Sequence, residues 1–374
     1  MKQLRTGYTT GACAAAGVRA ALACYRGEKP DIVSLRALDG TMLRIPVVSV
    51  VRCPGGGVCA EVVKDAGDDP DITNGVSVFT TVELRPEPGI VFRAGEGIGT
   101  VTKPGLAVPP GEPAINPGPR KLIQRVVDED LGGISAGVII TIAIPAGVEL
   151  AKKTLNPILG IEGGISIIGT TGVVRPMSEE GFKNSLLPQI DVARAAGCET
   201  LIFVPGKIGE RIGCSWGLPR EAMVQTSNFI GFMLEGAADR GVRQVLLFGH
   251  PGKLAKVAAG VFHTHNRIAD ARLETFAAYG AAAGLAQEQV QRVLAANTTE
   301  DAIAILSEAG LRDTVCRTIA GRASARAEQY LFGRMKVGAV LVSLRGELLG
   351  MDEKAEEIGR SFSWRIPANG ERAD

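Results

Sequence analysis

The chain has 374 residues, a length that at roughly 100 to 200 residues per domain predicts two domains, or three, each able to bury its own core. Its 41 Lys and Arg residues balance 40 Asp and Glu residues, so no long-range field favours nucleic acid, an anionic membrane or an acidic protein partner. Glycine is abundant, at 48 residues, whereas aromatic residues make up only 5%. The length excludes a mini-protein that needs disulfide staples, and the glycine content predicts many tight turns.

The cysteines and the first residues indicate a compartment. Seven cysteines occur without a Cys-x-x-Cys pair or a clustered Cys/His set, so we expect no protein-bound metal. An odd number of cysteines indicates free thiols in a reducing cytosol. The N-terminus lacks the apolar core of a signal peptide, and no window reaches about 18 uninterrupted apolar residues. We therefore expect a cytoplasmic protein with no membrane segment.

Residues 1–150 are predicted to form a glycine-rich α+β domain, because short strands are grouped around few helices. Thr10 is predicted to cap a helix over 12–25, whose small residues would let it lie very close to a sheet. Runs rich in Val, Ile and Thr predict the other elements: strands over 32–38, 43–51, 58–63, 76–84, 90–93 and 138–144, and a helix over 121–130.

Residues 151–345 are predicted to form an α/β domain with a mostly parallel, Rossmann-like sheet, since strands and helices alternate there. Ligands of such a sheet bind in loops at the carboxyl ends of its strands. Residues 346–374 are assigned to a C-terminal tail, expected to be loosely held after 352. The expected elements are strands over 165–168, 200–204, 244–248 and 337–344, and helices over 179–196, 220–237 and onward to about 331.

The opening segment, residues 5–16, places an arginine, hydroxyl groups and two glycines ahead of the first helix. The unpaired amides and positive dipole end of such a helix can hold a carboxylate or phosphate. The alternative is a well-capped helix with no ligand. Cys13 is expected to be a small packed residue and not a nucleophile, because no histidine is near it in sequence.

Four carboxylates fall within residues 65–71. They do not form an EF-hand loop, because Asn74 and Thr80 stand where glycine and glutamate are needed. Clustered carboxylates can instead orient a polar substrate or serve as a general base, and Asp65 and Asp68 are the candidates. The alternative is a solvated turn between strands.

Two glycine-rich segments follow. Residues 95–105 lack the dinucleotide fingerprint, because Thr100 and Thr102 stand where glycine is needed, which leaves a flexible loop carrying Lys103. Prolines and glycines in 111–120 fix an extended path that presents Glu112 and Arg120. A connector between domains is the alternative interpretation of this second segment.

A Gly-Thr-Thr-Gly sequence at 169–172 follows the strand predicted over 165–168. A glycine turn after a parallel strand lets the backbone approach an adenosyl or phosphate ligand, although an ordinary strand-to-helix turn has the same pattern. The later segment 249–253 is not a P-loop, because Leu247 stands where glycine is needed.

The three histidines, His250, His263 and His265, fall within sixteen positions, so any acid/base work by imidazole must come from this segment. His263 and His265 would share one face of an extended strand, but no third metal ligand stands at a telling distance. His250 is the stronger candidate because it lies at the carboxyl end of a predicted strand.

Taken together, these segments closely resemble the cobalt-precorrin-5B C(1)-methyltransferase family, the CbiD-type enzymes of anaerobic cobalamin biosynthesis. The resemblance covers nearly the whole chain, and Asn266 departs from the family pattern, where serine is expected. The segments that carry it, in order, are 6–11 with the alanine-rich helix, 64–71, 95–103, 112–117, 169–172 and 249–256.

The resemblance implies a cytoplasmic enzyme that uses S-adenosyl-L-methionine to methylate carbon 1 of cobalt-precorrin-5B, giving cobalt-precorrin-6A. It also implies a fold unrelated to the other ring methylases of that pathway. Cobalt would be carried by the substrate, a small-molecule corrin precursor, and a homo-oligomer is a candidate assembly. The competing function class is a non-enzymatic tetrapyrrole carrier or scaffold, and the failed P-loop and dinucleotide patterns disfavour a kinase.

Methyl transfer depends mainly on holding the two reacting atoms in line and excluding water. The substrate's carboxylates must be met by individual cationic and hydroxyl groups. We expect roles as follows: substrate binding by Arg5, Thr9, Thr10, Lys103, Arg120 and Lys253; adenosylmethionine binding by Gly169, Thr170, Thr171 and Gly172, faced by Gly249 and Gly252; and proton movement by Asp65, Asp68 or His250.

Overall fold

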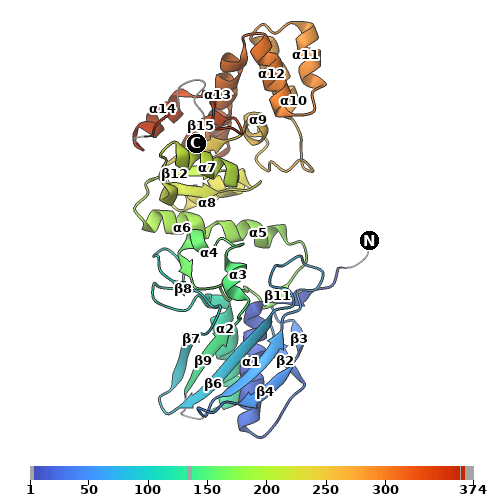
Figure 1. Ribbon diagram of the computed structural model, residues 1–374, viewed down its shortest axis with the longest axis vertical. Helices are drawn as coiled ribbons and strands as arrows, with labels where there is room; N and C mark the ends of the chain where they lie inside the picture. The colour runs from blue at the N-terminus through green and yellow to red at the C-terminus, as the bar shows by residue number, and fades with distance from the viewer. Residues whose placement is uncertain (1–3, 133–136, 363, 367–374) are drawn as a thin grey trace. The chain divides into compact units, whose positions relative to one another are not determined.

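The computed structural model describes residues 4–132, 137–362 and 364–366, and its elements are labelled in Figure 1. The chain divides into two compact units, Met1–Glu179 and Glu180–Asp374, each a mixture of helices and strands. Residues as late as 174 belong with the N-terminal strands, because β11 (Val173–Val174) pairs with β1 (Gly7–Tyr8). Among the described residues, no helix combines the length and apolarity needed to span a bilayer.

The first unit is built on a five-stranded mixed sheet in the order β4-β5-β6-β9-β7. All neighbours in it are antiparallel except β7 and β9, which run parallel. Two strands form a separate antiparallel ribbon, β2-β3. The bounds are β2 (Ile32–Arg36), β3 (Met42–Pro46), β4 (Ser49–Arg52), β5 (Val58–Val63), β6 (Ser77–Arg85), β7 (Gly89–Ala94), β8 (Thr100–Val101), β9 (Gly137–Ala143) and β10 (Ile161–Glu162).

Helix α1 (Thr10–Tyr25) covers one face of this sheet, packing on β5 and β6, and α2 (Pro117–Leu131) packs on α1 (Figure 1). The alanines of α1 are buried, and a Cβ atom on Gly17 of the same helix would lie 2.8 Å from the Thr80 side chain. The predicted close approach of a small-residue helix to a sheet is therefore confirmed. Two short helices follow, α3 (Gly147–Ala151) and α4 (Asn156–Leu159).

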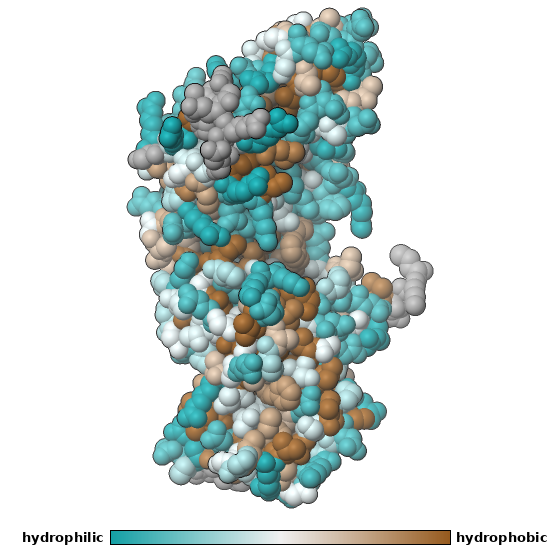
Figure 2. Space-filling view, in the orientation of Figure 1, coloured by the Kyte–Doolittle hydropathy of each residue, from teal (hydrophilic) through white to brown (hydrophobic). Residues whose placement is uncertain are grey.

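The opposite face of the sheet is only half buried. In β6 the side chains alternate between buried and intermediate positions, as expected for a strand with one covered face. Figure 2 shows apolar residues interspersed with polar ones over the exposed side of this unit.

Three predictions for the first unit are wrong in detail. The cap of α1 is Thr9, not Thr10, because the Thr9 hydroxyl accepts the amide of Ala12 at 3.2 Å. The strand expected over 43–51 is two strands in different sheets, broken after Pro46, which has no amide to donate. Residues 165–168 form only isolated bridges, so no parallel strand precedes the Gly-Thr-Thr-Gly turn.

The second unit is built on a five-stranded sheet in the order β13-β12-β14-β15-β16. The first three pairings are parallel and the last is antiparallel, so this sheet is also mixed. Strands β14 and β15 are almost continuously buried, as expected for interior strands covered on both faces. The bounds are β12 (Thr200–Val204), β13 (Met223–Gln225), β14 (Gln244–Gly249), β15 (Lys336–Val342) and β16 (Leu348–Met351).

One core of this unit gathers around Trp216, whose ring centroid lies 5.2 Å from that of Phe248 in an edge arrangement. The helices are α5 (Glu179–Leu186), α6 (Pro188–Ala195), α7 (Lys207–Ser215), α8 (Ile230–Asp239), α9 (Pro251–Ala258), α10 (Arg272–Ala282), α11 (Gln287–Leu294), α12 (Thr299–Glu308), α13 (Arg312–Tyr330) and α14 (Glu353–Arg360).

Three expectations for this unit also differ from the structure. The helix predicted over 179–196 is broken at Pro188. The helix predicted over 220–237 is a short 3₁₀ turn followed by β13 and then α8. The segment after 352 is not loose through Arg360, because Asp352 caps α14 by accepting the amide of Ala355 at 3.0 Å, and Ile358 is buried.

Candidate functional site

The strand order of the second unit marks a place where a ligand would bind. Strand β12 has β13 on one side and β14 on the other, so the chain reverses its direction across the sheet there. Open α/β sheets bind ligands outside the carboxyl ends of their strands at such a switch point. The carboxyl ends of β12 and β14 meet closely, because a Cβ atom on Gly249 would lie 2.8 Å from Pro205.

A hollow of about 510 Å³ opens beside these strand ends, and we refer to it as the strand-end hollow. It is lined by Asn228, His250, Gly252, Lys253, Thr264, His265, Asn266, Arg272, Thr298, Thr299 and Glu300.

Lys253 ties three strand-end loops together. Its ammonium donates to the carbonyl of Pro205 at 3.3 Å and to that of Ser227 at 3.1 Å. Burial lowers the pKa of Lys253, and the charge of Lys256 lowers it further. The predicted ligand residue is thus a partly buried cation at the switch point, with one of its three hydrogens left over.

His250 is the N-cap of α9, and both of its ring nitrogens are engaged. Nδ1 accepts the amide of Gly252 at 3.1 Å, and Nε2 pairs with the carboxylate of Glu300. A Cβ atom on Gly252 would lie 2.9 Å from Nδ1, so glycine allows this close approach. His250, Gly252 and Lys253, three residues predicted from the sequence, are therefore brought together.

The first turn of α12 supplies the wall that the sequence analysis missed. Thr298 caps this helix, and its side chain exchanges hydrogen bonds with Asp301. Thr299 is 2% exposed, and its Oγ1 atom has no hydrogen-bond partner among the described residues. A capping box of Thr298 with Asp301 was readable in the sequence, but its proximity to His250 was not.

Lys256 holds the loop that contributes Thr264 and Asn266 to the lining of the hollow. It is fully buried, and its ammonium donates to the Thr264 carbonyl at 3.2 Å, to the Asn266 side chain at 2.6 Å and to the Ala269 carbonyl at 2.9 Å. Asn266, the departure from the family pattern, therefore contributes to holding this loop.

His263 and His265 lie on the same loop, with ring centroids 6.4 Å apart. Where the structure describes the chain, no group of three His, Cys, Asp or Glu side chains is arranged to hold a metal ion.

In the first unit, Arg5, Asp65 and Asp68 form a second cluster. The Arg5 guanidinium pairs with both oxygens of Asp65, and the Arg5 amide donates to Asp68 at 2.7 Å. The hydrogen bond from Arg5 lowers the pKa of Asp65. The predicted base candidates and the predicted anion ligand are thus bonded to one another, and a lowered pKa makes Asp65 a weak base.

The start of α1 meets the Gly-Thr-Thr-Gly turn directly. The Thr9 amide donates to the Gly172 carbonyl at 3.0 Å, and a Cβ atom on Gly169 would overlap the Thr9 side chain. The Thr10 hydroxyl bonds both the amide and the carbonyl of Ile168. The turn therefore lies in the first unit, apart in the chain from the strand-end residues Gly249 and Gly252 of the second unit.

This packing bears on the predicted anion site at the helix start. The Gly11 amide donates to the Ile168 carbonyl at 3.1 Å, the Ala12 amide to Thr9, and the Cys13 amide to the Thr9 carbonyl at 3.0 Å. These three amides of the helix start already have acceptors within the protein, which matches the alternative of a capped helix with no ligand. Burial raises the pKa of Cys13 to about 12, as expected for a packed thiol.

Arg120 and Lys103 lie elsewhere in the first unit. Arg120 donates to Glu112 at 2.7 Å and to the Ile115 carbonyl at 2.8 Å, so it fixes the extended segment before α2. Lys103 is exposed, and the stem of its side chain passes over Gly160, where a Cβ atom would overlap it.

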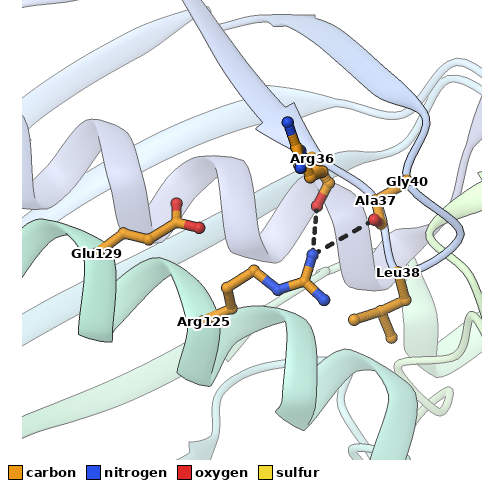
Figure 3. A pocket seen from close by; sticks show the side chains of 6 residues that line it. All are labelled: Arg36, Ala37, Leu38, Gly40, Arg125 and Glu129. Carbon is orange, nitrogen blue, oxygen red and sulfur yellow. Dashed lines mark hydrogen bonds between the residues drawn. The ribbon is translucent and has the colours of Figure 1, made fainter.

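A smaller hollow of about 440 Å³ in the first unit is lined by two arginines that the sequence analysis did not select (Figure 3). Arg125 points from α2 toward the end of β2 and donates to the carbonyls of Arg36 and Ala37 at 3.3 and 3.4 Å. Glu129 and Leu38 complete the rim. Arg125 thus brings a guanidinium group, which can hold an anion, to this hollow.

Comparison with known proteins gives the family. The CbiD model matches residues 1–176, and the model described as CbiD, C-terminal domain matches residues 263–353. The chain is 49% identical over 360 residues to the cobalt-precorrin-5B C(1)-methyltransferase of Moorella thermoacetica, covering 96% of this chain and 98% of that protein. It is 46% identical over 352 residues to the protein of the same name from Methanocaldococcus jannaschii, covering 93% and 96%.

Among solved structures, the cobalamin biosynthesis protein (cbiD) of Archaeoglobus fulgidus is 27% identical, with a TM-score of 0.38 over 72% of this chain and 84% of that one. The family models and the curated relatives together span nearly the whole sequence. The chain therefore belongs to the CbiD family.

Proposed function

We propose that the chain is an S-adenosylmethionine-dependent methyltransferase that methylates carbon 1 of cobalt-precorrin-5B, giving cobalt-precorrin-6A in anaerobic cobalamin biosynthesis. One observation carries this proposal: 49% identity over nearly the full length of a protein named for that reaction. The methyl donor and the corrin precursor are both small molecules. The enzyme works in the cytoplasm, and it is able to assemble as a homo-oligomer.

The two units act as two domains. The sheet of the second unit binds its ligand at the carboxyl ends of its strands, as a Rossmann-like sheet does. The support is the reversal of strand order at β12 together with the hollow at the carboxyl ends of the strands. Gly249, Gly252 and Lys253 lie where a donor would be bound. The turn over 169–172 is the competing location for the donor.

The corrin precursor is a polycarboxylate, so it needs cations that are not already neutralised. Lys103 and the Arg36–Arg125 hollow are the candidates in the first unit, and Arg5, 60% exposed, would first have to release Asp65. Thr9, Thr10 and Arg120 support the fold around them through their hydrogen bonds. Asp68 remains the candidate for proton movement there, since Asp65 is held by Arg5.

The test is a reaction under anaerobic conditions with purified protein, cobalt-precorrin-5B and adenosylmethionine carrying a ¹³C-labelled methyl group. We expect one labelled methyl group on carbon 1 of the product, detected by NMR, and S-adenosylhomocysteine in equal amount. A reaction without protein is the control. Binding of the precursor with no methyl transfer would contradict the proposal and favour the carrier function.

A further inference from the structure

We propose that Glu300 binds the amino-acid end of the methyl donor in the strand-end hollow, and that His250 positions Glu300 for this role. The proposal rests on the proposed function for the identity of the donor. It assigns a binding residue on α12, an element that the sequence analysis did not connect with the site.

The hydrogen bonds of His250 set its tautomer. Since Nδ1 accepts the amide hydrogen of Gly252, the proton of the neutral ring lies on Nε2. That proton is directed at the Glu300 carboxylate. To accept a proton from a substrate, His250 would have to give up the contact of Nδ1 with the Gly252 amide, because Nε2 already carries a proton. The geometry therefore favours a residue that fixes the orientation of Glu300.

Glu300 keeps most of its capacity to accept hydrogen bonds. Only its Oε1 atom is used by His250, whereas a carboxylate offers about four acceptor positions. Its side chain is 46% exposed and lines the hollow. The carboxylate is therefore able to accept hydrogen bonds from a ligand in the hollow that brings N–H or O–H donors.

Two cations of the same hollow also have capacity left. Lys253 uses two of its three hydrogens on carbonyl groups. Arg272 holds Asp270 through Nε and Nη2, both at 2.7 Å, which leaves Nη1 without a partner among the described residues. The hollow thus presents one carboxylate and two spare cationic donors.

This bipolar lining matches the zwitterionic amino-acid end of adenosylmethionine. The ammonium group of the ligand would bind Glu300, and its carboxylate would bind Lys253 or Arg272. A polycarboxylate ring would instead meet Glu300 as a like charge. The lining thus offers a partner to each charge of the zwitterion, whereas the carboxylates of the corrin precursor would be met by Lys253 and Arg272 alone.

Thr299 gives an independent indication of a ligand. Its hydroxyl oxygen is buried without a hydrogen-bond partner in the described part of the chain, which costs free energy unless something satisfies it. This oxygen lies 3.5 Å from the position of a Cβ atom on Gly252, and both residues line the hollow. A bound polar ligand would provide the missing partner.

The first experiment measures binding of S-adenosylhomocysteine by calorimetry. Glu300→Gln should weaken binding by about 10- to 100-fold, because a hydrogen bond to a charged group contributes about 1.5–3 kcal/mol. Glu288→Gln is the matched control, since Glu288 also lies in the first turn of a helix but outside the hollow, and it should bind as the wild type does. Equal affinity of the two variants would overturn the proposal.

The second experiment separates the ends of the ligand. Methylthioadenosine carries the adenine and ribose of the donor but no amino acid, so Glu300→Gln should leave its affinity unchanged. An equal loss for both ligands would overturn the assignment to the amino-acid end. If Thr170→Trp abolishes binding of S-adenosylhomocysteine while Glu300→Gln does not weaken it, the donor binds at the turn over 169–172 in the first unit and the proposal fails.

The role of His250 is tested by a conservative rescue. His250→Gln keeps an N–H group that can reach Glu300, whereas His250→Ala removes it. We expect His250→Ala to raise KM for the donor more than it lowers kcat, and His250→Gln to restore most of the KM. A fall in kcat at unchanged KM, with no rescue, would show that His250 moves a proton instead.

These outcomes are distinguishable from failure of the proposed function. If the wild type neither binds S-adenosylhomocysteine nor transfers a methyl group, the proposed function fails. If the wild type does both and Glu300→Gln behaves as Glu288→Gln does, only the present inference fails.

Discussion

At the scale of single residues, the first unit contains a buried ion pair outside any candidate ligand contact. The Lys64 side chain is 2% exposed, and its ammonium pairs with Asp71, whose side chain is 24% exposed. Thr73 donates its amide to Asp71 at 2.7 Å. Part of the acidic segment 64–75 thus has a structural role, because it neutralises a lysine that cannot reach water.

Asp71→Asn should destabilise the first unit by about 3 kcal/mol, since it leaves a buried ammonium uncompensated. Burial alone would raise the pKa of Asp71, but the charge and hydrogen bond of Lys64 outweigh it and the pKa is lowered. Because the pKa of Asp71 is lower in the folded state, the ionised carboxylate stabilises the fold fully above the ordinary pKa of about 3.9. This stabilisation is lost as pH falls through the folded-state pKa. Urea unfolding followed by circular dichroism from pH 7 to pH 2 should show this loss below about pH 4 in the wild type only.

Asp31→Asn, at an exposed position in the same unit, is the control and should unfold as the wild type does at every pH. A variant Asp71→Asn with wild-type stability at pH 7 would contradict the role of the pair.

Single residues of the site were predictable only where local pattern marks them. His250 and Lys253 follow a recognisable buried strand, so their place at its carboxyl end could be inferred. Glu300 could not, because it is 50 positions away from His250 and only the packing of α12 brings it there. The Arg36–Arg125 hollow likewise joins the end of β2 to α2, which no spacing in the sequence indicates.

At the scale of elements, the packing of α1 depends on Gly17. A Cβ atom there would lie 2.8 Å from both Cβ and Oγ1 of Thr80, which is fully buried on β6. By contrast, Gly321 in α13 has space, with the nearest atom, Cβ of Asp352, 3.9 Å away. The two helical glycines therefore predict opposite effects of the same substitution.

Gly17→Ala should destabilise the protein by about 1–3 kcal/mol through overpacking. Gly321→Ala should stabilise it by up to about 1 kcal/mol, because alanine is the better helix former and meets only ordinary contact. Thermal or urea unfolding of both variants checks this. The double variant with Thr80→Ala should recover much of the loss at Gly17, and a loss that persists unchanged would place its cause elsewhere.

Elements with a clear period were predicted best. Strand β5 has the expected bounds, Val58–Val63, and its side chains alternate between buried and more exposed positions. The helix predicted over 220–237 was wrong, since Met223–Gln225 is a three-residue strand too short to show a period. The isoleucines at 165 and 167 are buried like strand residues, but they make only isolated bridges.

At the scale of the whole molecule, each unit has a hydrophobic core of its own. Both tryptophans of the chain, Trp216 and Trp364, belong to the second unit, with ring centroids 6.0 Å apart. Trp216 is fully buried. Tryptophan fluorescence therefore reports on the second unit, whereas circular dichroism in the far ultraviolet reports on both.

S-adenosylhomocysteine should shift the fluorescence-detected unfolding of the second unit to higher urea, because a ligand that binds only the folded state stabilises it. At about 100 times Kd the gain is about 2.7 kcal/mol. Gly17→Ala should lower the urea midpoint of the first unit only, which is the part of the dichroism transition that fluorescence does not detect. A ligand shift confined to that other part would place the donor in the first unit. Coincident transitions in every variant would mean that the two cores unfold together, and the ligand shift would then have to be located by the Glu300→Gln comparison.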